Sequence, residues 1–120
     1  MPTYAVSASY NPQHWSRLAQ APAAAGIGLR RALAGVGGSV TSMHWALDTL
    51  GLVAIVTAPD AESMAAVSIS MAATGVFAAF TTRQLVESAE LADVLRRADA
   101  AGLLPPDEPA SREGDDRRSS

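Results

Sequence analysis

The chain has 120 residues, no cysteine and a formal net charge of −3. This length suits one domain rather than a two-domain enzyme, and the lack of cysteine excludes a disulfide framework, a thiolate nucleophile and a zinc finger. The acidic balance and the absence of a basic run argue against nucleic-acid binding, because proteins that bind phosphates cluster lysine and arginine on one surface.

Alanine limits the size of the hydrophobic core. Hydrophobic residues make up 48% of the chain, but 25 of them are alanine, which leaves only 33 larger apolar side chains. A core of this size gains from additional burial against a partner subunit. We therefore expect a homodimer.

Hydrophobic periodicity and turn residues divide the first hundred residues into strands and helices. Strands show two-residue alternation, whereas helices begin at capping residues and end at proline or glycine. The expected elements, in chain order, are strand 3–10, helix 11–20, helix 23–36 after Pro22, strand 40–47, strand 52–57, helix 60–73, strand 76–81 and helix 81–100.

Three local signals set the helix boundaries. Asn11-Pro12 is expected to cap the first helix, and Ala58-Pro59-Asp60 is expected to cap the helix of residues 60–73. Thr81-x-x-Gln84 is interpreted as a capping box that opens the last helix, whose apolar stripe is formed by Leu85, Ala89, Ala92 and Leu95. The sequence from Pro105 onward is polar and contains proline, so residues 101–120 are predicted to be a disordered tail after a domain of residues 1–100.

The order βαββαβ, followed by a C-terminal helix, predicts an α+β ferredoxin-like fold, with helices on one face of a four-stranded antiparallel sheet. The other face then needs a cover. The apolar strand residues expected to require it are Val53, Ile55, Met43, Trp45 and Phe77, or their alternates. A second copy would cover this face and form a dimeric α/β-barrel.

The segment Ser63–Thr82 is uncharged and mostly apolar, so it has to be weighed as a membrane span. Its helix-like pattern ends at Gly75 and a strand-like pattern follows, which favours a helix and a strand over a span. The N-terminus lacks the basic and apolar regions of a signal peptide. We expect a cytoplasmic protein.

Several of these segments resemble the GYD-domain family. The resemblance rests on the start Met1–Tyr4, the break at Ala21-Pro22, the run Leu52–Asp60 and Phe80-Thr81-Thr82, and it covers residues 1–90. It implies a small ferredoxin-like protein of the dimeric α/β-barrel type without a settled activity. The Gly-Tyr-Asp motif that names the family is absent, because the corresponding hairpin has the sequence Asp48-Thr49-Leu50-Gly51.

His44 is the candidate catalytic residue. It lies within a predicted strand, where alternation places it on the same face as Val40, Ser42 and Ala46. If His44 faces an enclosed cavity, it is the best general base in the chain. The alternative, which we favour, is a histidine packed at a subunit interface.

Five further residues are candidate ligand contacts because they carry polar groups or aromatic rings: Tyr4, His14, Trp15, Trp45 and Asp48. Each also has a structural alternative: His14 is favoured as a surface residue near a helix start, Asp48 is expected at the start of a turn, and a tyrosine commonly packs its ring while its hydroxyl reaches water. Neither histidine has a ligand at metal-site spacing, so no metal is predicted. No cofactor motif is present either.

Two functions remain open on the sequence alone. One is the binding of a small apolar molecule by a dimer, or a structural dimer. The other is a cofactor-independent oxygenase or isomerase that uses His44, which rests on fold analogy.

Overall fold

The computed structural model describes residues 1–24 and 26–102. The chain divides into a unit of residues Met1–Val86 and a second unit that begins at Glu87. Residues 103–120 of the predicted tail lie outside the described residues. The first unit contains, in chain order, β1 (Thr3–Tyr10), the 3-10 helix η1 (Pro12–His14), α1 (Trp15–Gln20), the 3-10 helix η2 (Pro22–Ala24), α2 (Ile27–Gly35), β2 (Ser39–Ala46), β3 (Gly51–Thr57), α3 (Ala61–Ala72) and β4 (Phe77–Leu85). The second contains α4 (Ser88–Ala100).

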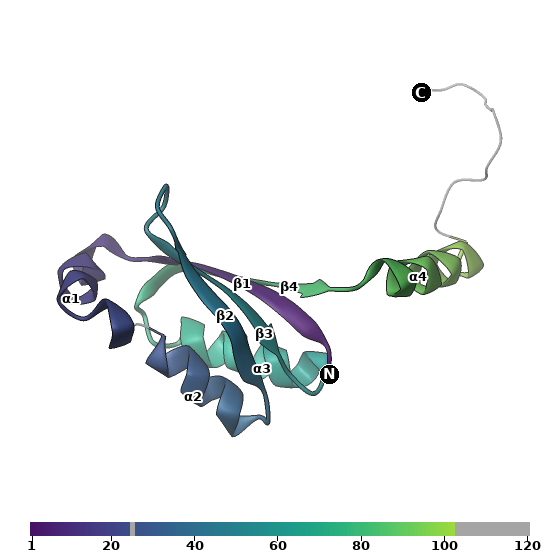
Figure 1. Cartoon of the computed structure of the whole chain (residues 1–120), viewed down its shortest axis with the longest axis horizontal. Helices are drawn as coiled ribbons and strands as arrows, with labels where there is room; N and C mark the ends of the chain where they lie inside the picture. The colour runs from purple at the N-terminus through teal and green to yellow at the C-terminus, as the bar shows by residue number, and fades with distance from the viewer. Residues whose placement is uncertain (25, 103–120) are drawn as a thin grey trace, which may run out of the picture. The chain divides into compact units, whose positions relative to one another are not determined.

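The four strands form one antiparallel sheet in the order β2-β3-β1-β4. α2 and α3 pack against each other and lie on the same face of the sheet (Figure 1). This arrangement confirms the predicted α+β ferredoxin-like fold. β1 and β3 are the two central strands, and β1 pairs with both β3 and β4.

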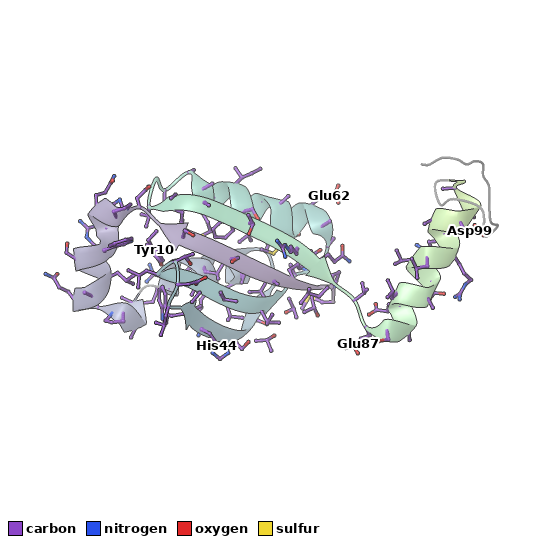
Figure 2. All side chains as sticks on the ribbon, turned by 90° about the horizontal axis from the view of Figure 1, so that it is seen from above. Tyr10, His44, Glu62, Glu87 and Asp99 are labelled. Carbon is purple, nitrogen blue, oxygen red and sulfur yellow. The ribbon has the colours of Figure 1, made fainter. Side chains whose placement is uncertain are left out.

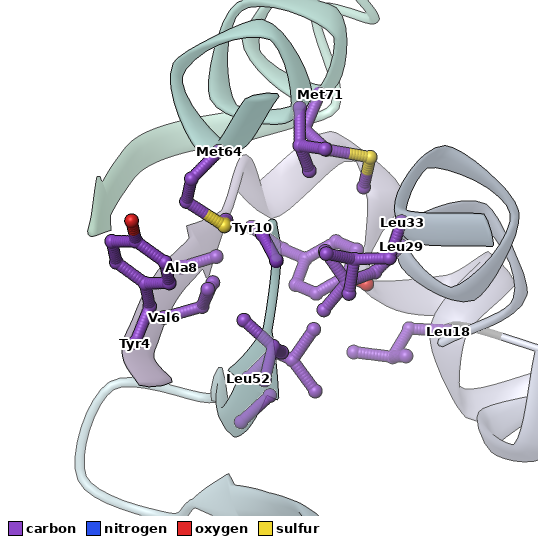
Figure 3. Packing of buried hydrophobic residues seen from close by; sticks show 14 residues of the cluster. Tyr4, Val6, Ala8, Tyr10, Leu18, Leu29, Leu33, Leu52, Met64 and Met71 are labelled. Carbon is purple, nitrogen blue, oxygen red and sulfur yellow. The ribbon is translucent and has the colours of Figure 1, made fainter. Parts of the chain in front are cut away.

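The core lies between the sheet and the helices (Figure 3). Alternation along β1 turns Tyr4, Val6, Ala8 and Tyr10 inward, as the sequence predicts, and all four are buried. The α-helices contribute six buried side chains, Leu18, Leu29, Leu33, Met64, Val67 and Met71. Complete burial of each large side chain stabilises the fold by about 1.5–3 kcal/mol.

Two predicted helix boundaries are confirmed by their hydrogen bonds. Asp60 has extended backbone angles, and its side chain accepts a hydrogen bond from the Ser63 N–H at 2.7 Å. At the end of α2, Gly37 adopts a positive φ of 83°, and the Gly38 N–H donates to the Leu33 carbonyl at 2.8 Å. Glycine adopts this left-handed backbone without steric cost, so the chain leaves the helix there.

The helical region between β1 and β2 differs from its prediction. η1 and α1 replace a single helix, and the Asn11 side chain does not cap them; its amide Nδ2 donates to the Gly75 carbonyl at 3.0 Å instead. After Pro22 the chain forms only η2, and α2 begins at Ile27. Proline and the early glycines explain the late start, since both disfavour a helix interior.

The boundary between β4 and the last helix was also predicted wrongly. Thr81 and Gln84 lie within β4, which pairs with β1 as far as Leu85 opposite Thr3. α4 begins at Ser88, where Glu87 and Glu90 form a capping box. The Glu87 N–H donates to Glu90 Oε1 at 3.0 Å. Leu85 therefore belongs to a strand and not to the apolar stripe of a helix.

A bulge in β2 changes which residues face the helices. The register shifts between Val40 and Ser42, so Val40 lies opposite the buried Val56, whereas Ser42 and His44 lie on the opposite face. The predicted shared face of Val40 and His44 is wrong because the extra residue reverses the alternation.

The sheet face without helices carries fewer large side chains than predicted. Met43, Trp45 and Phe77 pack against the core, and only Val53 and Ile55 of the five expected residues lie on this helix-free face. Most of the others are small or polar: Thr3, Ala5, Ser7, Ser9, Ser42, Ala46, Thr57, Ala79 and Thr81. Figure 2 looks onto this face, with His44 near its edge.

The segment Ser63–Thr82 divides between α3 and β4, as predicted. Among the described residues, no helix is long and apolar enough to cross a membrane. The cytoplasmic location stays a prediction.

Candidate functional site

A cavity of about 260 Å³ opens at one end of the core, and we call it the end cavity. Its walls come from the end of β1, from η1 to η2, from the start of α2 and from the connection between α3 and β4. The lining residues are Tyr10, His14, Arg17, Leu18, Ala21, Ala24, Gly28, Met71, Thr74, Val76 and Phe77. This volume exceeds the roughly 150 Å³ that admits a benzene ring in an apolar protein cavity.

Hydrogen bonds attach the wall that carries His14 to the sheet. The Asn11 N–H donates to the Val76 carbonyl at 2.9 Å, next to the bond between Asn11 Nδ2 and Gly75. The Trp15 indole N–H donates to the Tyr10 carbonyl at 3.3 Å. These contacts fix η1 and the start of α1, and with them the positions of His14 and Arg17.

Aromatic rings form one wall of the end cavity. The ring centroids of Tyr10 and Phe77 lie 4.8 Å apart with a tilt of 55°, and Phe80 continues the cluster at 5.4 Å from Phe77. Trp45 packs on the other side of Tyr10 at 5.9 Å. Burial raises the pKa of Tyr10, so its phenol stays protonated at neutral pH.

The polar side chains of the lining are few and carry no negative charge. His14 and Arg17 are the basic residues of the lining, and among the described residues no aspartate or glutamate lines the cavity. The Thr74 hydroxyl donates to the Met71 carbonyl at 2.7 Å. A mostly apolar cavity with a few polar groups is typical of small-molecule sites.

A second, more open hollow lies between α3 and the edge strand β4, and we call it the edge groove. Its lining includes Tyr4, Met64, Ser68, Thr82 and Gln84. The hydroxyls of Ser68 and Thr82 share a hydrogen bond of 2.8 Å. The Tyr4 hydroxyl is buried and has no hydrogen-bond partner among the described residues.

The predicted site residues do not converge on one place. His14 lines the end cavity and Tyr4 the edge groove, whereas Trp45 packs in the aromatic cluster. Trp15 is exposed and positions η1 through its indole.

His44 and Asp48 are exposed and line neither hollow. Asp48 belongs to the turn between β2 and β3. His44 lies on the helix-free face of edge strand β2, and its roles as a general base or as an interface residue both stay predictions.

Arg17 lines the cavity and can pair with an anion, but the sequence analysis did not identify it as a site residue. It follows His14 by three positions in a helical segment, and residues at this spacing share a helix face. That spacing was the available signal. Within the described ranges 1–24 and 26–102, no group of three or more His, Cys, Asp or Glu is arranged to hold a metal ion.

Comparison with known proteins places these features in a family. Residues 4–95 match the GYD domain, whereas no curated protein matches the sequence significantly. Among solved structures, the fold is similar to 5-chloro-2-hydroxyhydroquinone dehydrochlorinase from Burkholderia phenoliruptrix AC1100, determined with 2,5-dihydroxybenzoquinone. The identity is 14%, the TM-score is 0.45, and the match covers 73% of this chain and 97% of the other. The GYD match spans most of the ferredoxin-like unit and agrees with the resemblance seen in its strands, so the chain belongs to the GYD domain family.

Proposed function

We propose that the protein binds a small, mostly apolar molecule in the end cavity. The observation that carries this proposal is the cavity itself, a hollow of about 260 Å³ beside the core with an aromatic wall and few polar groups. Apolar surface left open in this way is released from water when a ligand enters, which supplies the driving force for binding.

Gly28 offers a direct test of this site. A Cβ atom built there meets only the Met71 Cε within 4 Å, at an ordinary contact distance of 3.7 Å. A leucine at position 28 therefore fits the backbone and extends toward the cavity that Gly28 lines. Gly28→Leu should occupy the ligand's space without unfolding α2, because leucine favours a helix more than glycine does.

The experiment combines native mass spectrometry with a fluorescent probe. We expect the purified protein to carry a small molecule, or to bind the neutral dye N-phenyl-1-naphthylamine saturably, and Gly28→Leu to lose that binding. Gly35→Leu is the matched control, because Gly35 lies on the same helix, lines neither hollow and has nothing within 4 Å of a built Cβ. The proposal fails if Gly28→Leu binds as the wild type does, or if the wild type binds nothing.

We also propose that two copies associate through the helix-free face. Val53 and Ile55 are half-buried there on the central strand β3, and within the unit Met1–Val86 the helices α2 and α3 cover the opposite face. The small side chains around them allow two sheets to approach closely. Light scattering at micromolar concentration should give twice the chain mass of 12.4 kDa, and a stable monomer would contradict the proposal.

A further inference from the structure

We propose that the ligand of the end cavity is an aromatic acid, whose ring lies against the wall of Tyr10 and Phe77 and whose anionic group pairs with Arg17. This inference rests on the proposed function and adds the chemical class of the ligand. Two independent properties of the site support it, the charge of its lining and the nature of its wall.

Among the described residues, no acidic side chain lines the cavity beside Arg17. Arg17 lines the cavity, but the ion pair found among the described residues joins Arg96 and Asp93 on α4. The unit Met1–Val86 holds three acidic residues, and none of them lines the cavity: Asp48, Asp60 and Glu62. Asp60 is already occupied as the cap of α3.

An anionic ligand would supply the missing partner. A guanidinium presents a planar fork that matches a carboxylate, and charge-assisted hydrogen bonds of this kind are stronger than neutral ones. The half-buried His14 lines the same cavity and offers a ring N–H as a further donor. Arg17 is itself exposed, so water partly screens its pairing with the ligand, whereas His14 is half-buried beside the apolar wall.

The aromatic wall of the cavity suits a flat ring as the apolar part of the ligand. Tyr10 and Phe77 are tilted against each other rather than stacked, so each leaves part of its ring to the cavity. Flat rings pack well against such walls in offset or edge-to-face geometry. Leu18, Met71 and Val76 complete the apolar lining, and methionine adapts to aromatic partners of different shape.

The test uses two probes of the same shape and size, naphthalene-2-carboxylate and naphthalene-2-carboxamide, measured by calorimetry at 0.15 M salt. We expect the wild type to bind the carboxylate at least about tenfold more tightly than the amide, which corresponds to about 1.4 kcal/mol. Arg17→Gln should reduce this preference to about twofold, because it weakens binding of the carboxylate more than binding of the amide. Arg17→Lys should retain part of the preference, since it keeps the charge but not the fork.

Arg30→Gln is the control for general electrostatics, because Arg30 is exposed on α2 and does not line the cavity. The inference is overturned if the wild type binds both probes equally, if Arg17→Gln keeps the preference, or if Arg30→Gln removes it to the same degree. If the wild type binds both probes equally and Gly28→Leu binds neither, the aromatic acid is rejected but the proposed function stands. Binding of neither probe would reject the aromatic acid, and the mass spectrometry and dye experiment would then decide the proposed function by itself.

Discussion

Ile55→Arg tests the proposed dimer interface at its centre. Ile55 lies on β3 between Ala5 of β1 and Ser42 of β2, in the middle of the helix-free face. The charged or titratable side chains on that face are Arg83 and His44, and no carboxylate of the described strands lies there to pair with a new cation. In a symmetric dimer the substitution appears twice, so two unpaired charges enter one interface.

The expected loss of affinity follows from the cost of these charges. An uncompensated buried charge costs about 3 kcal/mol or more, so two copies weaken the dimer by about 6 kcal/mol. That difference raises the dissociation constant by about four orders of magnitude. The isolated subunit should lose less than about 1 kcal/mol, because Ile55 is only half-buried within one chain and arginine can extend into water.

Sedimentation velocity over a range of concentrations measures the effect, and thermal melts check the fold. Ile69→Arg is the matched control, because Ile69 lies on α3, on the other side of the sheet, and is 70% exposed. We expect Ile55→Arg to sediment as a folded monomer and Ile69→Arg to sediment as the wild type does. A dimer that persists unchanged in Ile55→Arg would refute the assignment of this face.

Four further predictions concern single positions. Gly38→Ala should lower the free energy of unfolding by about 1–3 kcal/mol, because a Cβ there would lie 2.3 Å from a backbone carbonyl oxygen of β3. Gly35→Ala, in open space on α2, should instead raise the free energy of unfolding by up to about 1 kcal/mol. Urea titration measures both effects. Tyr4→Phe should leave the melting temperature unchanged or raise it, because it removes a buried hydroxyl that has no hydrogen-bond partner among the described residues. A marked fall in the melting temperature would show that the hydroxyl makes a stabilising hydrogen bond. Asp60→Ala should destabilise α3 more than Asp60→Asn does at pH 7. Thermal melts in acid should show a smaller difference in stability between Asp60→Ala and the wild type, because hydrogen bonding lowers the pKa of Asp60 below its ordinary 3.8. The stabilisation by the Asp60 carboxylate is therefore present above that value and is lost as the pH falls through the lowered pKa. His44→Ala should weaken the dimer in sedimentation experiments without affecting ligand binding in the end cavity, and an unchanged dimer would remove His44 from the interface.

The strands of the core could be predicted because their alternation is local. Tyr4, Val6, Ala8 and Tyr10 identify the buried face of β1 from spacing alone, and Asp60 marks the start of α3 through its own side chain. These features depend on neighbours a few residues away. Reading along the chain is therefore sufficient to find them.

The wrong predictions concern segments whose secondary structure depends on pairing with distant parts of the chain. Thr81 and Gln84 have the spacing of a capping box, but pairing with β1 keeps both in a strand, and the capping box that forms uses Glu87 and Glu90. The bulge after Val40 depends in the same way on its register with β3. No local pattern reports such pairings, because the partner strand is contributed by another part of the chain.

The residues of the end cavity could also be predicted only in part. His14 could be proposed from its chemistry, whereas Arg17 gains its interest only from lining a hollow beside Met71 and Phe77. A cavity is a property of packing between elements, so its lining cannot be read from one helix. His44 could likewise be proposed from its chemistry, and the structure adds that it is exposed on β2 and lines neither hollow.

The central place of β1 has a consequence for the order of folding. β1 is the first strand to be synthesised, but its partners lie far along the chain: Thr3 pairs with Thr57 on one side and with Leu85 on the other. The β2–β3 hairpin is local, and such contacts form faster than pairings that close long loops. We therefore expect the hairpin to form early and β4 to dock last against β1. Because Phe77 of β4 completes the wall of the end cavity, a ligand there would bind only chains that have finished this last step, and its binding would report the end of folding.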